Sequence, residues 1–165
     1  MKLAAAAAAL ALCGCASDVT LPASDSETLD PVAFFAGRTH GEAMLDTLIE
    51  SPVRVTVDSV GRMRGNALVL DQVIRSADKP ARIRRWTMWP VSPNRFSGSL
   101  TDATGPVHGT TEGPRAYIRY TMKNGFKVEQ QLALQSDGRT ILNRLEVTKF
   151  GLRVATLTET IRKLD

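Results

Sequence analysis

The sequence has 165 residues, and its 21 Lys and Arg against 17 Asp and Glu give a formal net charge of only +4. The basic residues form no concentrated block, which excludes the electrostatic footprint of a nucleic-acid-binding protein. The length suits one domain with a sizeable core, and both cysteines lie within the first 15 residues, so no disulfide framework supports that core.

The first 14 residues have the pattern of an export signal. Lys2 supplies one positive charge, and residues 3–12 form an unbroken apolar run. This run is shorter than the roughly 20 apolar residues of a membrane-spanning helix, but it fits the core of a signal peptide, which has about 7–15 residues. The sequence therefore predicts a signal peptide over residues 1–14 and an exported mature protein.

The segment Leu12-Cys13-Gly14-Cys15 holds both cysteines and resembles the lipobox of bacterial lipoproteins. A lipobox has leucine three places before the modified cysteine and a small residue directly before it, and Cys15 fits that spacing. A metal site needs about three or four ligands, and a structural disulfide needs partners separated by a closed loop. Two cysteines with one residue between them provide neither. We therefore predict lipidation at Cys15; the alternative is a plain secretory signal that is cut near Ala16.

Lipidation at Cys15 would anchor the protein through a thioether-linked diacylglycerol and an N-terminal acyl chain such as palmitate. Several chains together hold firmly, because each buried methylene adds about 0.8 kcal/mol. Ala16 follows Cys15, and an aspartate at this place retains lipoproteins of enteric-type bacteria in the inner membrane, so alanine favours the outer membrane. We expect the cell envelope of a Gram-negative bacterium, with the protein on the outer membrane facing the periplasm.

Residues 15–30 are rich in Ser, Asp and Thr and contain few apolar side chains. Flexible chains of this composition span roughly 5–6 Å times the square root of their length, which is about 20 Å here. We therefore expect a lipid anchor and flexible tether over residues 15–30, followed by a single β-barrel domain over residues 31–165.

From residue 31 onward, short β-rich runs alternate with turn residues. The predicted strands cover residues 40–48, 53–60, 66–75, 83–91, 95–100, 116–123, 126–134, 140–148 and 152–162. Asn124-Gly125 and Asp137-Gly138 favour tight hairpins, in which both central residues have positive φ, and Lys149-Phe150-Gly151 marks a third reversal. The last run also has helical spacing, but its alternating threonines favour a strand.

Nine or ten short strands with little helical periodicity predict an all-β protein, either a barrel or a sandwich. Four groups of residues resemble a family of bacterial lipoproteins catalogued only as a domain of unknown function: Phe34-Phe35-x-Gly37, Arg85-Trp86-Thr87, Phe96-Ser97-Gly98-Ser99 with Asp102 and Gly105, and Asn143-Arg144 with Lys149-Phe150-Gly151. This resemblance covers about residues 34–163 and implies a lipocalin-like (calycin-type), antiparallel up-and-down β-barrel of about 8–10 strands. It implies no activity, cofactor or catalytic residue.

Arginine and tryptophan gather in one predicted strand. Arg84, Trp86 and Met88 share one face of this strand, whereas Arg85 and Trp89 lie on the other. A guanidinium beside an indole in the mouth of a barrel could hold the acidic head of a lipid or fatty acid. We therefore select Arg84, Trp86 and Met88 as candidate ligand-binding residues; the alternative is that the arginines cover aromatic surface on the outside.

The remaining residues that could carry chemistry form no recognisable active site. His40 and His108 are the only histidines and are far apart in the sequence, so we expect no metal site. Asp102 is expected in an ordinary turn, and Arg144 could form an internal ion pair that closes the barrel. The sequence contains no Gly-x-Ser-x-Gly elbow, P-loop or dinucleotide fingerprint. We therefore predict no catalytic residue, no cofactor and no enzymatic activity.

Two functions agree with these predictions. The first is a membrane-tethered protein that binds or carries a lipophilic ligand, such as a lipid or fatty acid, inside the barrel. The alternative is a structural or interaction lipoprotein with a filled barrel that docks to an envelope partner. Small barrels can be filled by side chains or hold one ligand, so the presence of a cavity separates the two functions.

Overall fold

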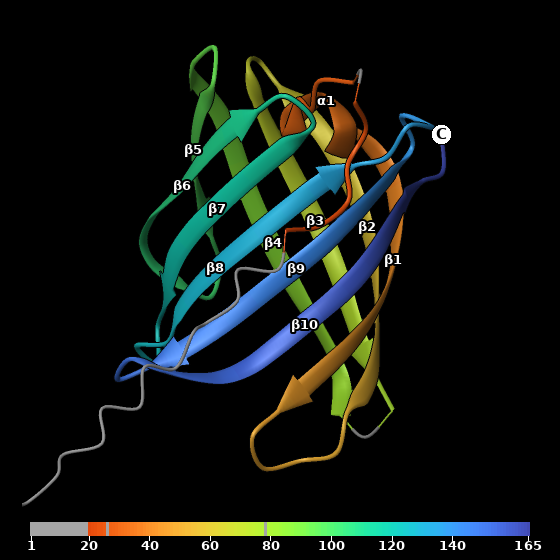
Figure 1. Ribbon diagram of the computed structural model, residues 1–165. Helices are drawn as coiled ribbons and strands as arrows, with labels where there is room; N and C mark the ends of the chain where they lie inside the picture. The colour runs from red at the N-terminus through yellow and green to blue at the C-terminus, as the bar shows by residue number, and fades with distance from the viewer. Residues whose placement is uncertain (1–19, 26, 78) are drawn as a thin grey trace, which may run out of the picture.

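The structure is a computed structural model that describes residues 20–25, 27–77 and 79–165. These residues form a closed antiparallel barrel of ten strands, with one short helix at one end (Figure 1). The elements are α1 (Pro31–Phe35), β1 (Gly37–Thr47), β2 (Val53–Arg64), β3 (Ala67–Ser76), β4 (Lys79–Ser92), β5 (Arg95–Leu100), β6 (Ala103–Glu112), β7 (Arg115–Met122), β8 (Lys127–Leu134), β9 (Thr140–Lys149) and β10 (Leu152–Lys163). Each strand pairs with its neighbours in sequence, and β10 pairs with β1 to close the barrel. The predicted all-β, up-and-down barrel is therefore confirmed.

Alternating side chains build the wall of the barrel. In β3, Leu68 and Leu70 are buried inside, whereas Asp71 lies on the outer face, where it pairs with Arg85 of β4. This period of two is the geometry of a pleated strand with one face on a core and one face in water. The C-terminal segment follows the same geometry as β10, so the prediction of a strand there is confirmed.

The sequence prediction misses β6, because Gly105 and Pro106 have the appearance of strand breakers. In the structure, the pairing of β6 with β7 shifts register between Thr104 and His108, and Gly105 has a φ of 75°. Gly and Pro are accepted at such a bulge because the hydrogen-bond ladder is already interrupted there. Asp102 lies in the turn between β5 and β6, as predicted.

Two of the three predicted tight turns have a different geometry. In Asn124-Gly125 and Asp137-Gly138, only the glycine has positive φ. The connection between β7 and β8 therefore extends over residues 123–126, and the carboxylate of Asp137 instead accepts hydrogen bonds from two backbone amides of its own loop. Phe150-Gly151 has positive φ at both residues, 51° and 80°, and forms the two-residue turn between β9 and β10.

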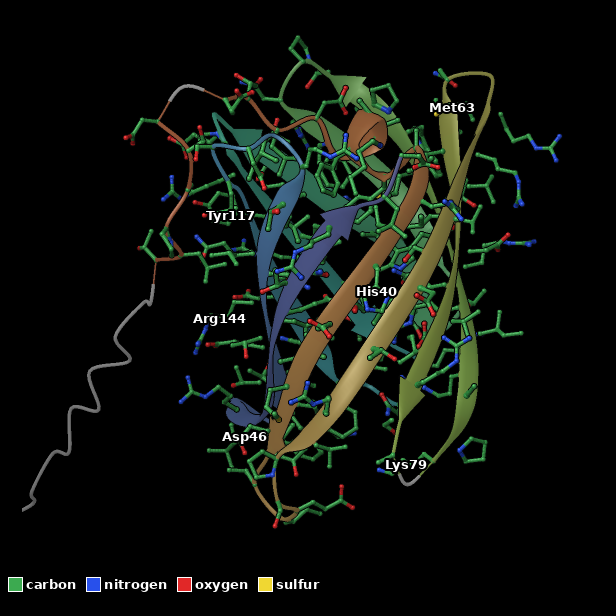
Figure 2. The ribbon with its side chains drawn as sticks, turned by 90° about the vertical axis from the view of Figure 1, so that its right-hand side faces the viewer. His40, Asp46, Met63, Lys79, Tyr117 and Arg144 are labelled. Carbon is green, nitrogen blue, oxygen red and sulfur yellow. The ribbon has the colours of Figure 1, made fainter. Side chains whose placement is uncertain are left out.

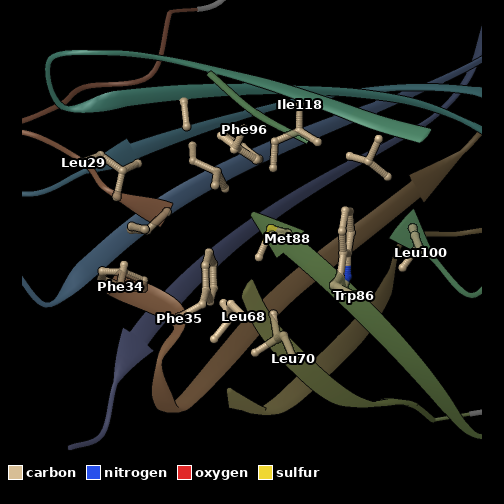
Figure 3. Packing of buried hydrophobic residues seen from close by; sticks show 14 of the residues in the cluster. Leu29, Phe34, Phe35, Leu68, Leu70, Trp86, Met88, Phe96, Leu100 and Ile118 are labelled. Atoms are coloured by element: carbon tan, nitrogen blue, oxygen red, sulfur yellow. The ribbon is translucent and has the colours of Figure 1, made fainter. Parts of the chain in front are cut away.

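One end of the barrel is closed by the short helix α1. Asp30 caps α1 by accepting hydrogen bonds from two backbone amides of the first turn. Phe34 and Phe35 are buried and pack edge to face, with ring centroids 5.2 Å apart (Figure 3). Burial of such a side chain contributes roughly 1.5–3 kcal/mol to the free energy of unfolding. Phe34 and Phe35 are both part of the main hydrophobic core. No helix among the described residues is long and apolar enough to cross a membrane.

Residues 20–25 and 27–30 do not form the free tether that the sequence predicts. The backbone amide of Ser24 donates to the carbonyl of Leu134 at 2.7 Å, and that of Leu29 donates to the carbonyl of Gly113 at 2.9 Å. The Leu29 side chain is buried beside α1 (Figure 3). The prediction is therefore corrected for residues 20–25 and 27–30, because hydrogen bonds and one buried leucine offset the entropy of ordering this segment. Residues 1–19, with the predicted signal peptide and Cys15, lie outside the described residues.

Candidate ligand-binding cavity

The half of the barrel opposite α1 encloses a cavity of about 720 Å³. Phe35, Leu70 and Met88 lie on its inner side, and Pro52 of the β1–β2 loop and Lys79 at the start of β4 lie at its mouth. Ligand pockets in proteins commonly measure about 300–1,000 Å³. This half of the barrel is therefore not filled by its own side chains.

The walls of the cavity are mainly apolar and come from inward positions of several strands. They include Val53, Val55 and Val57 of β2, Ile74 of β3, Val147 of β9 and Leu157 of β10. The closed half instead contains large side chains such as Phe34 and Phe96. The short β-branched side chains on these walls leave part of the space between them unfilled, although larger side chains such as Trp86 and Tyr120 also line the cavity.

The three candidate residues of β4 all line the cavity, on the face that they share. Trp86 and Met88 are buried, and the side chain of Arg84 is only 14% exposed. Arg85 points out of the barrel, where its guanidinium pairs with Asp71 at 2.6 Å. The alternative, an arginine on the outer surface, therefore describes Arg85 and not Arg84.

Arg84 already has an acidic partner. Its Nε and Nη2 atoms donate to Oδ2 of Asp102 at 3.1 and 2.7 Å. Such a pair is both charge-assisted and directional, so neither group is free to hold another charge at full strength. A ligand carboxylate would have to compete with Asp102, which argues against the prediction that Arg84 holds an acidic head group.

Trp86 has a fixed orientation in the cavity wall. Its Nε1 donates to Oε1 of Gln72 at 2.8 Å, and Nε2 of Gln72 donates to Oγ of Ser59 at 3.2 Å. Tyr120 packs edge-on against the indole, with ring centroids 5.5 Å apart. The polar edge of the indole is thus satisfied, and Trp86 contributes a rigid apolar surface to the cavity.

Glu159 of β10 and Asn143 of β9 form a polar pair in the cavity that was not predicted from the sequence. Nδ2 of Asn143 donates to Oε2 of Glu159 at 2.7 Å. Burial raises the pKa of Glu159, and the hydrogen bond from Asn143 and two nearby basic side chains oppose this only in part. Gly41 of β1 leaves room for the carboxylate, which a Cβ at that position would meet. The available signal was the spacing of Glu159 between Leu157 and Ile161 on one face of a strand.

Three buried acceptor oxygens have no hydrogen-bond partner among the described residues: Oδ1 of Asp102, Oε1 of Gln130 and Oδ1 of Asn143. Gln130 and Asn143 line the cavity. An unpaired buried polar atom costs about 1–3 kcal/mol, so a bound group that donates a hydrogen bond would recover part of this energy. The cavity therefore suits an apolar chain with a neutral donor, such as a hydroxyl or an amide, better than a carboxylate, which donates none.

The other residues that the sequence analysis considered lie outside the cavity. Arg144 is on the outer face of β9 (Figure 2) and pairs with Glu146 at 2.8 Å, so the suggestion of an internal ion pair is corrected. His40 is also on the outer face, with its Nδ1 atom 2.7 Å from Oδ1 of Asp58. His108 is exposed on β6. Within residues 20–25, 27–77 and 79–165, no group of three or more His, Cys, Asp and Glu side chains could hold a metal ion.

A closed antiparallel barrel that is plugged at one end and hollow at the other defines this protein as a lipocalin-like β-barrel. The S-type phycobiliprotein lyase CPES from Guillardia theta is similar, with a TM-score of 0.66 over 81% of this chain and 90% of that chain, at 6% sequence identity. Rv2717c from M. tuberculosis is also similar, with a TM-score of 0.62 over 83% of this chain and 99% of that chain, at 14% identity. At such low identity, these similarities show the fold alone.

The chain belongs to the family described as protein of unknown function DUF3833, whose model matches residues 9–163. This match agrees with the resemblance to a domain of unknown function seen in the sequence. It also begins earlier than that resemblance and includes Cys15. No curated protein matches the sequence.

Proposed function

We propose that this protein is an envelope lipoprotein that binds or carries a lipophilic ligand, without converting it, in the cavity of its barrel. The observation that carries the proposal is a cavity of about 720 Å³ with mainly apolar walls and one open end. Transfer of an alkyl chain out of water contributes about 0.8 kcal/mol per methylene. A micromolar Kd corresponds to about −8.2 kcal/mol, and deducting about 4 kcal/mol for association raises the requirement to roughly 15 buried methylenes or their equivalent in methylenes and hydrogen bonds. The alternative function, docking by a filled barrel, assumes an interior without such a cavity and is therefore not supported.

The polar side chains of the cavity favour a neutral head group. Arg84 is paired with Asp102, and Glu159 is a half-buried acid beside Asn143. A carboxylate would compete with Asp102 and would face the Glu159 carboxyl group, whereas a hydroxyl could donate to the unpaired oxygens. We therefore expect a long-chain alcohol to bind more tightly than the fatty acid of the same length at neutral pH.

Tryptophan emission tests ligand binding. The chain has two tryptophans, and only Trp86 lines the cavity, so Trp89→Phe leaves a single reporter inside it. Dodecanol should change this emission at micromolar concentrations, and dodecanoate should do so at higher concentrations. Native mass spectrometry with lipid extraction on the purified protein should also show a co-purified lipid.

Val57→Phe and Val73→Phe are a matched pair of variants for this test. Val57 lines the cavity, whereas Val73 lies on the outer face of β3 next to it. An added ring at position 57 occupies ligand space and should weaken binding about tenfold or more, while the same ring at position 73 should have little effect. The ligand-binding proposal fails if no lipid co-purifies and no ligand changes the emission at concentrations on the order of tens of micromolar.

The lipid anchor is the second part of the proposal, and the lipobox-like segment around Cys15 supports it. The residues between Cys15 and Thr20 span at most about 18 Å, so the barrel would lie close to the lipid surface. Labelled palmitate should enter the parent protein and the Cys13→Ser variant but not the Cys15→Ser variant. Label in the Cys15→Ser variant would contradict the anchor, and membrane fractionation would test the proposed location on the outer membrane facing the periplasm.

A further inference from the structure

Four exposed apolar side chains gather at the open end of the barrel, beside the mouth of the cavity. Leu48 and Ile49 lie in the β1–β2 loop, and Phe150 and Leu152 lie at the β9–β10 turn, opposite α1 (Figure 1). The backbone amide of Leu48 donates to the carbonyl of Val154 in β10 at 3.2 Å, so the β1–β2 loop lies beside the first residues of the strand that follows the β9–β10 turn. Ile49 is 91% exposed and Phe150 is 93% exposed. We call these four residues the mouth patch.

Phe150 is not explained by the fold. It has a φ of 51° and is the only residue other than glycine with positive φ among those that the structure describes. Gly or Asn would adopt this conformation more easily, and the Phe150 ring contributes nothing to the buried core. A large aromatic ring at an unfavourable backbone position, fully in water, points to a role outside the barrel itself.

Basic side chains lie beside the Phe150 part of the mouth patch. Lys123 and Lys127 are exposed at the β7–β8 loop, and Nζ of Lys149 lies 4.3 Å from the ring centroid of Phe126 and 5.5 Å from that of Phe150. None of these three lysines has a carboxylate partner within the described part of the chain.

The acidic side chains at this end are mostly neutralised. Glu50 lies 3.6 Å from Lys79, and Glu146 pairs with two arginines on the outer face. Asp46, which lies at this end of β1 (Figure 2), is the exception, because none of the salt bridges among the described residues involves it. The open end therefore combines apolar tips with an excess of positive charge.

We infer that the mouth patch docks onto a lipid surface that carries anionic head groups. Leu48, Ile49, Phe150 and Leu152 would enter the boundary between head groups and acyl chains, while the lysines contact the head groups. Docking at this end places the mouth of the cavity directly against the lipid, so a ligand need not cross water. This last consequence depends on the proposed ligand-binding function, whereas docking itself does not.

Vesicle flotation tests the inference on the chain from residue 15 onward with Cys15→Ser, which has no lipid and keeps every described residue. It should bind vesicles that contain phosphatidylglycerol, bind purely phosphatidylcholine vesicles much more weakly, and dissociate as salt is raised. Lys123→Gln with Lys127→Gln should lower binding to the anionic vesicles roughly twentyfold, since each lysine near such a surface contributes about fivefold.

Ile49→Asn with Phe150→Asn should lower vesicle binding about tenfold or more. Asn tolerates positive φ, so this pair keeps the turn, and an unchanged melting temperature checks that it does. Met63→Asn with Val91→Asn is the matched control, because both residues are exposed and apolar but lie away from the open end. Met63 is at the end of the barrel that α1 closes (Figure 2), and Val91 is at the end of β4 farthest from Lys79. The control pair should bind vesicles like the parent.

The inference would be overturned if the Ile49 and Phe150 pair and the Met63 and Val91 pair lost vesicle binding equally. It would also be overturned if the parent did not bind anionic vesicles. A different result would favour a protein partner over a lipid surface: the parent binds no vesicles but forms a stable complex with another protein, and the Ile49 and Phe150 pair loses that complex. Val57→Phe separates the two proposals, because it should weaken alcohol binding and leave vesicle binding intact. A parent that binds dodecanol but no vesicles overturns docking alone.

Discussion

Glu159 places a carboxyl group in an apolar wall, and this links the stability of the barrel to pH. Burial raises the pKa of Glu159 above the ordinary value of 4.5, so the folded protein holds this proton more tightly than the unfolded chain does. The contribution of this group to the free energy of unfolding therefore falls as pH rises from the ordinary pKa through the raised one. Only above the raised pKa does the folded state carry the full cost of burying a charged carboxylate at this position.

Glu159→Gln removes that penalty and can keep a hydrogen bond to Asn143. We expect the variant to melt at a higher temperature than the parent at about pH 7 and close to the parent at about pH 4, where both states of the parent are largely protonated. Calorimetry at the two pH values measures this. A difference in melting temperature that is the same at both values would show that Glu159 titrates normally.

Some site residues were predictable because strand geometry alone determines their face. Arg84, Trp86 and Met88 alternate along one strand, so locating the strand was enough to bring them together in the cavity. The partner of Arg84 was not predictable, because Asp102 lies in the turn between β5 and β6 and no local sequence pattern links that turn to Arg84 of β4. Glu159 was missed because a charged residue in a strand is normally assigned to the outer face.

At the scale of elements, the β9–β10 turn depends on two consecutive residues with positive φ. Gly151 has a φ of 80°, where a β-branched residue is strongly disfavoured. Gly151→Val should therefore destabilise the protein by roughly 1–3 kcal/mol, which corresponds to a melting temperature about 2–12 °C lower. Leu152→Val is the control, because this exposed neighbour lies outside the positive-φ region. An unchanged melting temperature for Gly151→Val would mean that the turn is placed wrongly.

Local signals predicted the hairpins, and non-local contacts explain what was missed. Turn residues between alternating runs located most strands in the correct order, because each hairpin joins neighbours in sequence. Residues 20–25 and 27–30 have the composition of a flexible chain, and contacts with residues far along the sequence, such as Gly113, Arg115 and Leu134, order them. No local pattern carries that information.

At the scale of the whole molecule, the strand pattern predicted a barrel or a sandwich, and the family resemblance favoured the barrel. The cavity was not predictable. Whether inward side chains meet depends on the width of the barrel, which follows from strand number and stagger and not from alternation. With ten strands, the valines of β2 do not reach across the open half, and the space between the walls remains.

A cavity with one closed end predicts a limit to ligand length. Phe35 closes the inner side, and the mouth opens beside Lys79, so each methylene added to an alkyl alcohol should increase affinity about fourfold only until the chain fills the cavity. Further methylenes would extend into water and add little. The break should appear in Trp86 emission, and in the melting temperature, which rises by about 5–10 °C when ligand is at 100 times its Kd. Val57→Phe should move the break to shorter alcohols. A steady increase in affinity without any break would indicate binding on the outer surface of the barrel.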